Sequence, residues 1–175
     1  MSKEEETKVK KPFVIEAIML AIYGNLLVPS EPVEYLIPSS TLRELDEFIG
    51  NSSPIMHDPE EEQRVREIIG DMIQYFHNPF RRKMMEKSLV APWSTVTFEH
   101  SDTVHFTIVK AEDTAMWGEI FDPIETELIL TAMKWDVPLI TDQTEWQDRL
   151  LEYVIPIQFY DIEDFDFAVE PKLYL

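Results

Sequence analysis

The segment DPIETELILTAMKWDVPLITDQTEWQDRLLEYVIPIQF (residues 122–159) decides the fold class, because helical and extended patterns alternate along it. It opens with Asp122, Pro123 and Glu125, which form a capping box with proline at the first helical position. The pattern behind this helix predicts a strand, a second helix and a second strand, at residues 137–141, 144–153 and 154–159. A helix that connects two neighbouring strands of a sheet makes those strands parallel.

The first forty residues contain a second unit of this kind. The short apolar run at 13–15 predicts a strand, the apolar run at 17–27 predicts a helix, and residues 33–37 predict another strand. Period-two alternation on both sides of a polar turn predicts a β-hairpin insertion at 95–109. Together these patterns predict an α/β fold, a three-layer sandwich with a mainly parallel central sheet.

Length and composition predict one domain with short appendages. The chain has 175 residues, of which 45% are hydrophobic, and this is enough to bury a sizeable core. Residues 1–11 are strongly charged and predict a flexible tail, while residues 12–160 are expected to form the single α/β domain. Residues 161–175 are acidic and aromatic without a clear period, which indicates a C-terminal extension.

The charge of the chain limits its partners. Its net charge is −19, so most of its surface repels phosphate backbones, and nucleic acid could bind only at a local basic patch. Such a patch occurs at residues 79–87, which carry a net charge of +3. The candidate contacts to nucleic acid are therefore Arg81, Arg82, Lys83 and Lys87.

The absence of cysteine excludes disulfides, thiolate zinc sites and cysteine nucleophiles, and it fits a reducing compartment. The charged stretch at 1–11 has no apolar run behind it, so it does not have the pattern of a signal peptide. The longest apolar stretch, around residues 17–22, is too short to span a bilayer. We therefore expect a cytoplasmic protein that does not insert into membranes.

Acidic and polar residues follow the predicted strands or open the predicted helices. Glu16 follows the strand at 13–15, and Thr141 and Asp142 follow the strand at the other end of the chain. Glu44 and Glu125 lie near helix N-termini. In open α/β sheets, the carboxyl ends of the strands form the binding site. Carboxylates that converge there repel one another, and Mg²⁺ or Mn²⁺ relieves that repulsion and can activate water for phosphoryl transfer.

Two stretches of the chain resemble the PIN-domain nucleases, namely IPSSTLRELDEF (37–48) and DPIETELILTAMKWDVPLITDQTEW (122–146). Members of that family are compact α/β domains that cleave RNA with metals held by about four acidic residues. The resemblance follows the order of the family's motifs rather than any single one of them, and it spans about residues 13–160.

The resemblance implies a metal-dependent endoribonuclease that acts on single-stranded RNA. Its metal ligands, holding Mg²⁺ or Mn²⁺, would be Glu16, Glu44, Glu125 and Asp142. Thr141 matches the threonine of the family's Thr-x-Asp motif and would orient the site, so these five residues are the expected catalytic set.

The chain departs from the family pattern at two positions. The first acid is Glu16 where the family usually has aspartate, and Gln143 stands where the family has the aspartate of Thr-x-Asp. These departures predict weak or degraded activity. An alternative is a catalytically silent PIN-like module that binds a protein partner, which could be a second copy of the chain. A third hypothesis, an acidic mimic of nucleic acid, depends on the net charge alone.

Three of the acids also have structural interpretations that the sequence leaves open. Glu125 could serve only to complete the capping box, and Glu44 could stabilise the first turn of a helix through the macrodipole. Asp142 could be the N-cap of the helix that follows it. Glu16 has no comparable role, since a carboxylate among apolar neighbours is expensive to bury without a partner.

Overall fold

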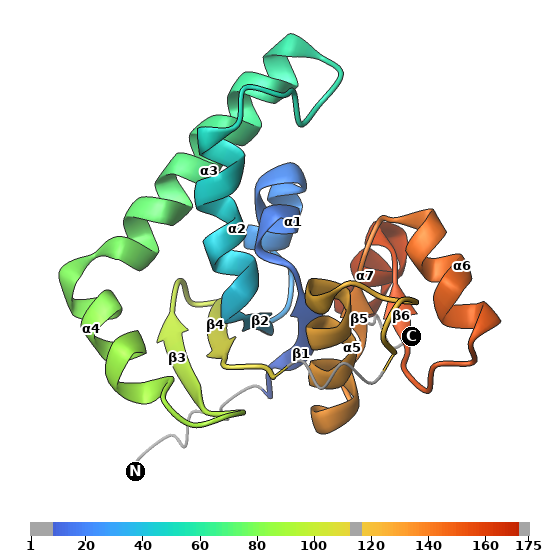
Figure 1. Cartoon of the computed structure of the whole chain (residues 1–175). Coiled ribbons are helices and arrows are strands. Elements are labelled where there is room, and N and C mark those ends of the chain that lie inside the picture. Colours follow the sequence, from blue (N-terminus) through green and yellow to red (C-terminus); the bar gives the residue numbers. More distant parts are fainter. Residues whose placement is uncertain (1–8, 113–116, 172–175) are drawn as a thin grey trace.

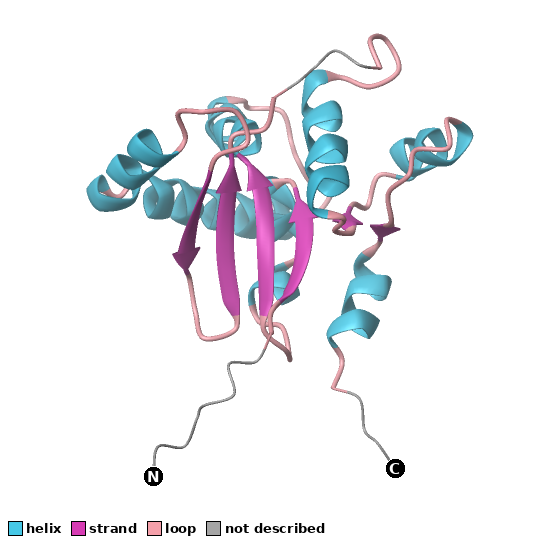
Figure 2. Ribbon diagram, turned by 90° about the horizontal axis from the view of Figure 1, so that it is seen from below, coloured by secondary structure: helices cyan, strands magenta, loops and turns pink. Residues whose placement is uncertain are grey.

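The computed structural model describes residues 9–112 and 117–171, which fold around one six-stranded sheet (Figure 1). The sheet has the order β3-β4-β2-β1-β5-β6, and all neighbours are parallel except the β3–β4 pair. Figure 2 shows the four longer strands side by side, with β3 running opposite to the others. The strands are β1 (Lys11–Ile15), β2 (Val33–Pro38), β3 (Thr95–Glu99), β4 (Val104–Val109), β5 (Leu139–Ile140) and β6 (Phe159–Tyr160).

Helices cover both faces of the sheet. Alternate residues of β1 point to opposite faces, so Phe13 and Ile15 pack with one set of helices and Val14 packs with the other. The first face is covered by α1 (Ala17–Ile22), α2 (Ser39–Gly50), α3 (Pro59–His77), α4 (Pro79–Ser88) and α7 (Ile162–Val169). The second face is covered by α5 (Pro123–Trp135) and α6 (Thr144–Glu152). The predicted α/β class and mainly parallel sheet are confirmed, and the layering is that of a three-layer sandwich.

Three predicted elements are shorter than the sequence indicated. The strand predicted at 137–141 pairs only at Leu139–Ile140, as β5. The helix predicted at 17–27 ends at Ile22, and a separate 3₁₀ turn, η1 (Gly24–Leu27), follows it. The strand predicted at 154–159 pairs only at its end, as part of β6. Val154 has a left-handed φ of 51°, and the amide of Ile155 donates to the carbonyl of Leu150 at 3.0 Å. Residues 154 and 155 therefore complete the turn after α6 instead of extending the strand.

Residues 95–109 form an antiparallel pair of strands that belongs to the central sheet. β4 pairs in parallel with β2 along its whole length, from Val33 opposite Val104 to Pro38 opposite Val109. The polar turn between β3 and β4 lies at the amino end of β2, where the amide of Val33 donates to the carbonyl of Thr103 at 2.8 Å. β3 and β4 are thus the two outer strands on one side of a continuous sheet.

The ends of the domain differ from those predicted. Residues 1–8 of the predicted tail and residues 172–175 of the extension lie outside the described residues, and Lys11 already pairs with Val33 in the sheet. The domain also continues past residue 160, because Asp161 caps α7 and Phe165 on that helix is fully buried in the core. The ring of Phe165 lies 5.1 Å from that of Phe13, measured between centroids.

The helices of the described ranges, 9–112 and 117–171, include none that is both long and apolar enough to cross a bilayer.

Candidate functional site

β1 and β5 are neighbours, and this places the first and last predicted acids at the same edge of the sheet. Ile15 pairs with Ile140, so Glu16 and Thr141 are the next residues on two adjacent parallel strands. The adjacency of these two strand ends is therefore confirmed. The side-chain amide of Gln143 reaches across and donates to Oε1 of Glu16, with 3.4 Å between nitrogen and oxygen.

The backbone that follows Glu16 is fixed by Thr41, a buried residue in the first turn of α2. Glu16 occupies the N-cap position of α1, but its carboxylate makes no capping hydrogen bond. Instead the hydroxyl of Thr41 accepts from the amide of Ala17 at 3.2 Å and donates to the carbonyl of Pro38 at 2.9 Å. Thr41 is 1% exposed, and it ties the start of α1 to the end of β2. The carboxylate of Glu16 is thereby left for another role.

The other three predicted acids all affect the pKa of Glu16. Burial raises this pKa, and the charges of Glu44, Asp142, Asp122 and Glu125 raise it further, to about 7. The carboxyl edge of the sheet therefore holds more negative charge than its own side chains neutralise, and Asp122 is a member of the group that the sequence reasoning missed.

Glu44 contributes to this group from the second turn of α2. The helix begins at Ser39, and its first turn contains no acidic residue, so the interpretation of Glu44 as a helix-start residue is wrong. The side chain is half-buried, and burial raises its pKa, as do the charges of Glu47, Asp122 and Glu127 in that order.

Glu125 has the structural role that the sequence allowed. Asp122 accepts from the amide of Glu125 at 2.7 Å, and the Glu125 carboxylate accepts from the amide of Asp122 at 3.1 Å, which completes the capping box. Arg149 of α6 also donates to both carboxylate oxygens, at 3.2 and 2.7 Å. Glu125 thus joins α5 to α6, and its charge is partly neutralised.

Replacing Glu125 with alanine is expected to lower the free energy of unfolding by about 1–2 kcal/mol, because a cap and a bidentate ion pair are lost together. Urea denaturation measures this change. The matched control is Glu119→Ala, which removes an exposed acid from the turn before α5 and should change stability by less than about 0.5 kcal/mol. Equal effects of the two substitutions would show that the cap and ion pair contribute nothing.

The exposed carboxylate of Asp142 accepts a hydrogen bond from Tyr23, which lies in the connection between β1 and β2. The hydroxyl of Tyr23 donates to Oδ2 of Asp142 at 2.6 Å. Burial of the phenol and this hydrogen bond raise the pKa of Tyr23 to about 12. The N-cap of α6 is Gln143, so the interpretation of Asp142 as the N-cap is wrong. No sequence signal identified Tyr23, because it simply follows the last residue of α1.

Thr141 shapes the turn that carries Asp142. It is 3% exposed, and its hydroxyl accepts from the amide of Gln143 at 3.2 Å. Its carbonyl accepts from the side-chain amide of Gln147 at 2.9 Å, and its own amide donates to the carbonyl of Tyr160 at 3.0 Å. These bonds make Thr141 a positioning residue.

The donor chemistry of this edge fits a hard divalent cation, since the available ligand atoms are carboxylate and amide oxygens. The arrangement of the side chains is looser than that of a formed metal centre. Within residues 9–112 and 117–171, no three Asp, Glu, His or Cys side chains are placed to hold one ion. The other acids are close enough to raise the pKa of Glu16, but their carboxylates would have to reorient to bind the same metal ion.

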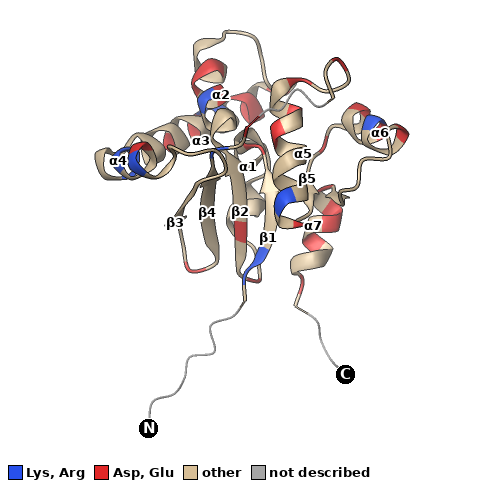
Figure 3. Ribbon diagram, turned by 60° about the horizontal axis from the view of Figure 1, so that its bottom comes forward, with Lys and Arg blue, Asp and Glu red and all other residues tan. Residues whose placement is uncertain are grey.

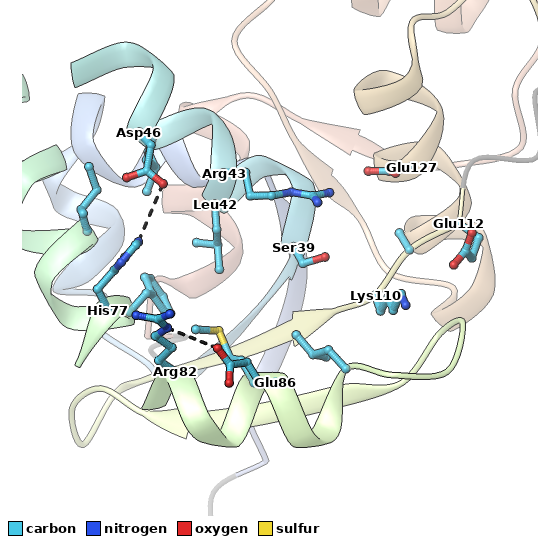
Figure 4. Close-up of a pocket in the computed structure, with 16 residues that line it drawn as sticks. Ser39, Leu42, Arg43, Asp46, His77, Arg82, Glu86, Lys110, Glu112 and Glu127 are labelled. Atoms are coloured by element: carbon cyan, nitrogen blue, oxygen red, sulfur yellow. Dashed lines mark hydrogen bonds and ion pairs between the residues drawn. The ribbon is translucent and has the colours of Figure 1, made fainter. Parts of the chain in front are cut away.

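The predicted basic patch lies on α4, whose ribbon carries the blue colour of Lys and Arg in Figure 3. Its members have different surroundings. The guanidinium of Arg81 lies over the ring of Tyr75, 3.8 Å from its centroid, and Arg82 pairs with Glu86 at 3.2 Å. Lys83 and Lys87 are exposed. Arg82 is the member that lines a pocket of about 750 Å³ (Figure 4).

That pocket shares helices α2 and α5 with the acidic edge, and the sequence reasoning did not identify it. Ser39 of α2 and Glu127 of α5 are among its lining residues. The hydroxyl of Ser40 donates to the Glu127 carboxylate, which connects the two helices, and the charge of Glu127 also raises the pKa of Glu44.

No protein-family model and no curated protein matches this chain, so an assignment of function depends on the arrangement of its own residues.

Proposed function

We propose that this chain is a metal-dependent endoribonuclease that cleaves single-stranded RNA in the cytoplasm. The observation that carries the proposal is the half-buried carboxyl group of Glu16, which is surrounded by the charges of four other acids. Such a group costs folding free energy unless a cation neutralises it. Mg²⁺ or Mn²⁺ bound at this edge would remove that cost.

The residues have separate roles in this proposal. Glu16 and Asp142 would hold the metal ion, with Glu44 as a third ligand, and Glu125 would contribute less because Arg149 already neutralises it. When bound, the ion would activate water and neutralise charge on the scissile phosphate. Tyr23 fixes one oxygen of the Asp142 carboxylate. Thr141 sets the turn between the strand and Asp142, and thereby the direction from which that carboxylate reaches the ion.

The two departures from the PIN-like pattern support weak activity. The extra methylene of Glu16 displaces its carboxylate relative to an aspartate, and misplacement by about 1 Å can cost about 10²-fold in rate. Gln143 carries no charge, and its amide donates to Glu16. We therefore propose slow cleavage that Mn²⁺ supports better than Mg²⁺.

The first test measures cleavage of a 5′-labelled single-stranded RNA of twenty nucleotides with Mn²⁺. Glu16→Gln and Asp142→Asn are expected to lower the rate about 10- to 100-fold, and Gln143→Asp to raise it, because a charge lost from the family pattern returns. Glu152→Gln, which changes an exposed acid at the end of α6, is the control and should leave the rate unchanged.

A second measurement separates metal binding from catalysis. Mn²⁺ should raise the melting temperature of the unmodified chain, since the ion binds the folded site, and it should raise that of Asp142→Asn less. If neither cleavage nor a melting shift occurs with Mn²⁺, the nuclease proposal is wrong. Cleavage that survives Glu16→Ala would show that the acids are wrongly assigned.

The second candidate function is a catalytically silent module that binds a protein partner. It is favoured by the hydrogen bond from Gln143 to Glu16, which occupies one carboxylate oxygen with an amide. If this function is correct, the chain still binds its protein partner in a chelator and after the substitution Asp142→Asn. The Gln143→Asp variant then does not cleave RNA.

A further inference from the structure

The pocket is lined by four helices and one strand end. It lies between α2, α3, α4, the Glu127 side of α5 and the segment after β4, and its volume is about 750 Å³. Cavities of 300–1,000 Å³ are typical of small-ligand sites. In Figure 4, Arg43 extends from α2 toward Glu127, and Lys110 and Glu112 lie below Glu127 in the view.

The floor of the pocket is apolar. Leu45 and Phe76 are buried beneath it, and four half-buried side chains form its surface, namely Leu42, Ile73, Met85 and Leu89. This floor contrasts with the charged surface of a protein whose net charge is −19. Aliphatic and thioether side chains offer a flat, polarisable surface that accepts the face of a planar ring.

Most charges at the rim already have partners. Asp46 lies 3.7 Å from Nε2 of His77, and Glu86 pairs with Arg82 at 3.2 Å. Glu127 accepts from the hydroxyl of Ser40. The remaining acid of the lining is Glu112, which follows Lys110 at the outer end of the pocket.

Two cations of the rim remain available to an anion. Arg43 is exposed and makes no hydrogen bond or ion pair with any residue that the structure describes. Lys110 donates to the carbonyl of Val90 at 2.8 Å, which leaves its charge and further N–H groups free. An Arg guanidinium and a Lys ammonium at the rim of an apolar floor are suited to a phosphate attached to a ring.

The pocket and the acidic edge share two helices. Arg43, which lines the pocket, is followed on α2 by Glu44. Glu127 of α5 also lines the pocket, and its charge raises the pKa of Glu44. An RNA strand held at Arg43 would therefore lie against the helix that carries Glu44.

We propose that this pocket binds one nucleotide of single-stranded RNA, adjacent to the phosphodiester that is cleaved at the acidic edge. The base lies on the apolar floor, and Arg43 and Lys110 contact the phosphate. This inference rests on the proposed function, and it explains how an acidic protein holds RNA with few cations. It also assigns RNA contacts to Arg43 and Lys110, which lie outside the basic patch of α4.

Binding is measured by fluorescence anisotropy with a labelled oligoadenylate of ten nucleotides, in EDTA so that no cleavage occurs. Arg43→Ala is expected to raise the Kd about tenfold, because a charge-assisted contact is lost. It should also reduce the slope of log K against log[salt] by about 0.7, the value for one phosphate contact to a single strand. The control is Lys134→Ala, which removes an exposed cation from the end of α5 and should leave the Kd within about twofold.

The contribution of the base is measured with a sugar–phosphate oligomer of the same length that lacks bases. Met85→Ala should weaken binding of oligoadenylate several-fold and leave binding of the abasic oligomer unchanged. Equal losses for Arg43→Ala and Lys134→Ala would show binding to charge alone and overturn the proposal. Displacement of the oligomer by AMP at concentrations below the oligomer's own Kd would also overturn it, in favour of a free nucleotide. The melting temperature of each variant confirms that it is folded.

The outcomes separate this inference from the nuclease proposal. Arg43-dependent binding without cleavage in Mn²⁺ would reject the nuclease and leave the pocket as an RNA site. Cleavage in Mn²⁺ that Arg43→Ala does not change, together with unchanged binding, would reject the pocket alone.

Discussion

Replacing Glu16 with glutamine is expected to raise the free energy of unfolding at pH 8 by up to about 3 kcal/mol. In the folded protein, burial and the neighbouring acids raise the pKa of Glu16 from 4.5 to about 7. One pKa unit corresponds to about 1.4 kcal/mol, so ionising this group in place costs about 3 kcal/mol at most. Glutamine has nearly the same shape and cannot ionise, so the variant avoids that cost.

The effect depends on pH in a defined direction. Between about pH 4.5 and 7, the folded protein keeps a proton on Glu16 that the unfolded chain has released. The contribution of Glu16 to stability is therefore fully present below about pH 4.5 and is lost as the pH rises to 7. The raised pKa of Glu44 acts in the same direction.

Urea denaturation of the unmodified chain and of Glu16→Gln between pH 4.5 and 8 measures the difference directly. The two proteins should differ least at pH 4.5 and most at pH 8. Glu152→Gln removes an exposed charge of the same kind and should show a small difference without this trend. A difference between unmodified chain and Glu16→Gln that stays constant with pH would show that Glu16 is ionised without cost.

Truncation of Phe165 to alanine should cost about 3–5 kcal/mol of stability, the usual range for a fully buried phenylalanine. Its side chain is 0% exposed, and its ring packs 5.1 Å from that of Phe13 and 6.2 Å from that of Tyr35, between centroids. The loss would show that α7 is part of the domain and that residues beyond 160 support β1 and β2.

The same helix provides the control for this prediction. Phe167 is 80% exposed, so Phe167→Ala should change the free energy of unfolding by less than about 0.5 kcal/mol. If Phe165→Ala is as mild as Phe167→Ala in urea denaturation, α7 does not contribute to the stability of the core.

The sequence was sufficient to predict the fold class and the meeting point of the two strand ends. Period-two and helical patterns locate β1, β2 and β5, and parallel pairing then brings Glu16 next to Thr141. The helix α7 was missed although Ile162, Phe165 and Val169 have helical spacing, because acids and exposed aromatic residues fill the positions between them. A short helix with such neighbours gives a weak periodic signal.

The environment of the acids could not be predicted, because it depends on tertiary packing. Tyr23 reaches Asp142 across 119 residues of sequence, and Arg149 reaches Glu125 from another helix. Local patterns carry no information about such partners. The same holds for the pocket, because its walls come from α2, α3, α4, α5 and the segment after β4, and only the packing of these elements creates the space.

The position of β1 between β2 and β5 has a consequence for the order in which the protein assembles during translation. β1, β2, β4 and β3 lie within residues 11–109, so these four of the six strands can form a sheet while the rest is still being synthesised. Glu16 and Gln143 are 127 residues apart, and their contact requires closure of that long loop. The acids consequently meet only after β5 has left the ribosome, so a nascent chain that lacks β5 cannot yet assemble the proposed catalytic edge.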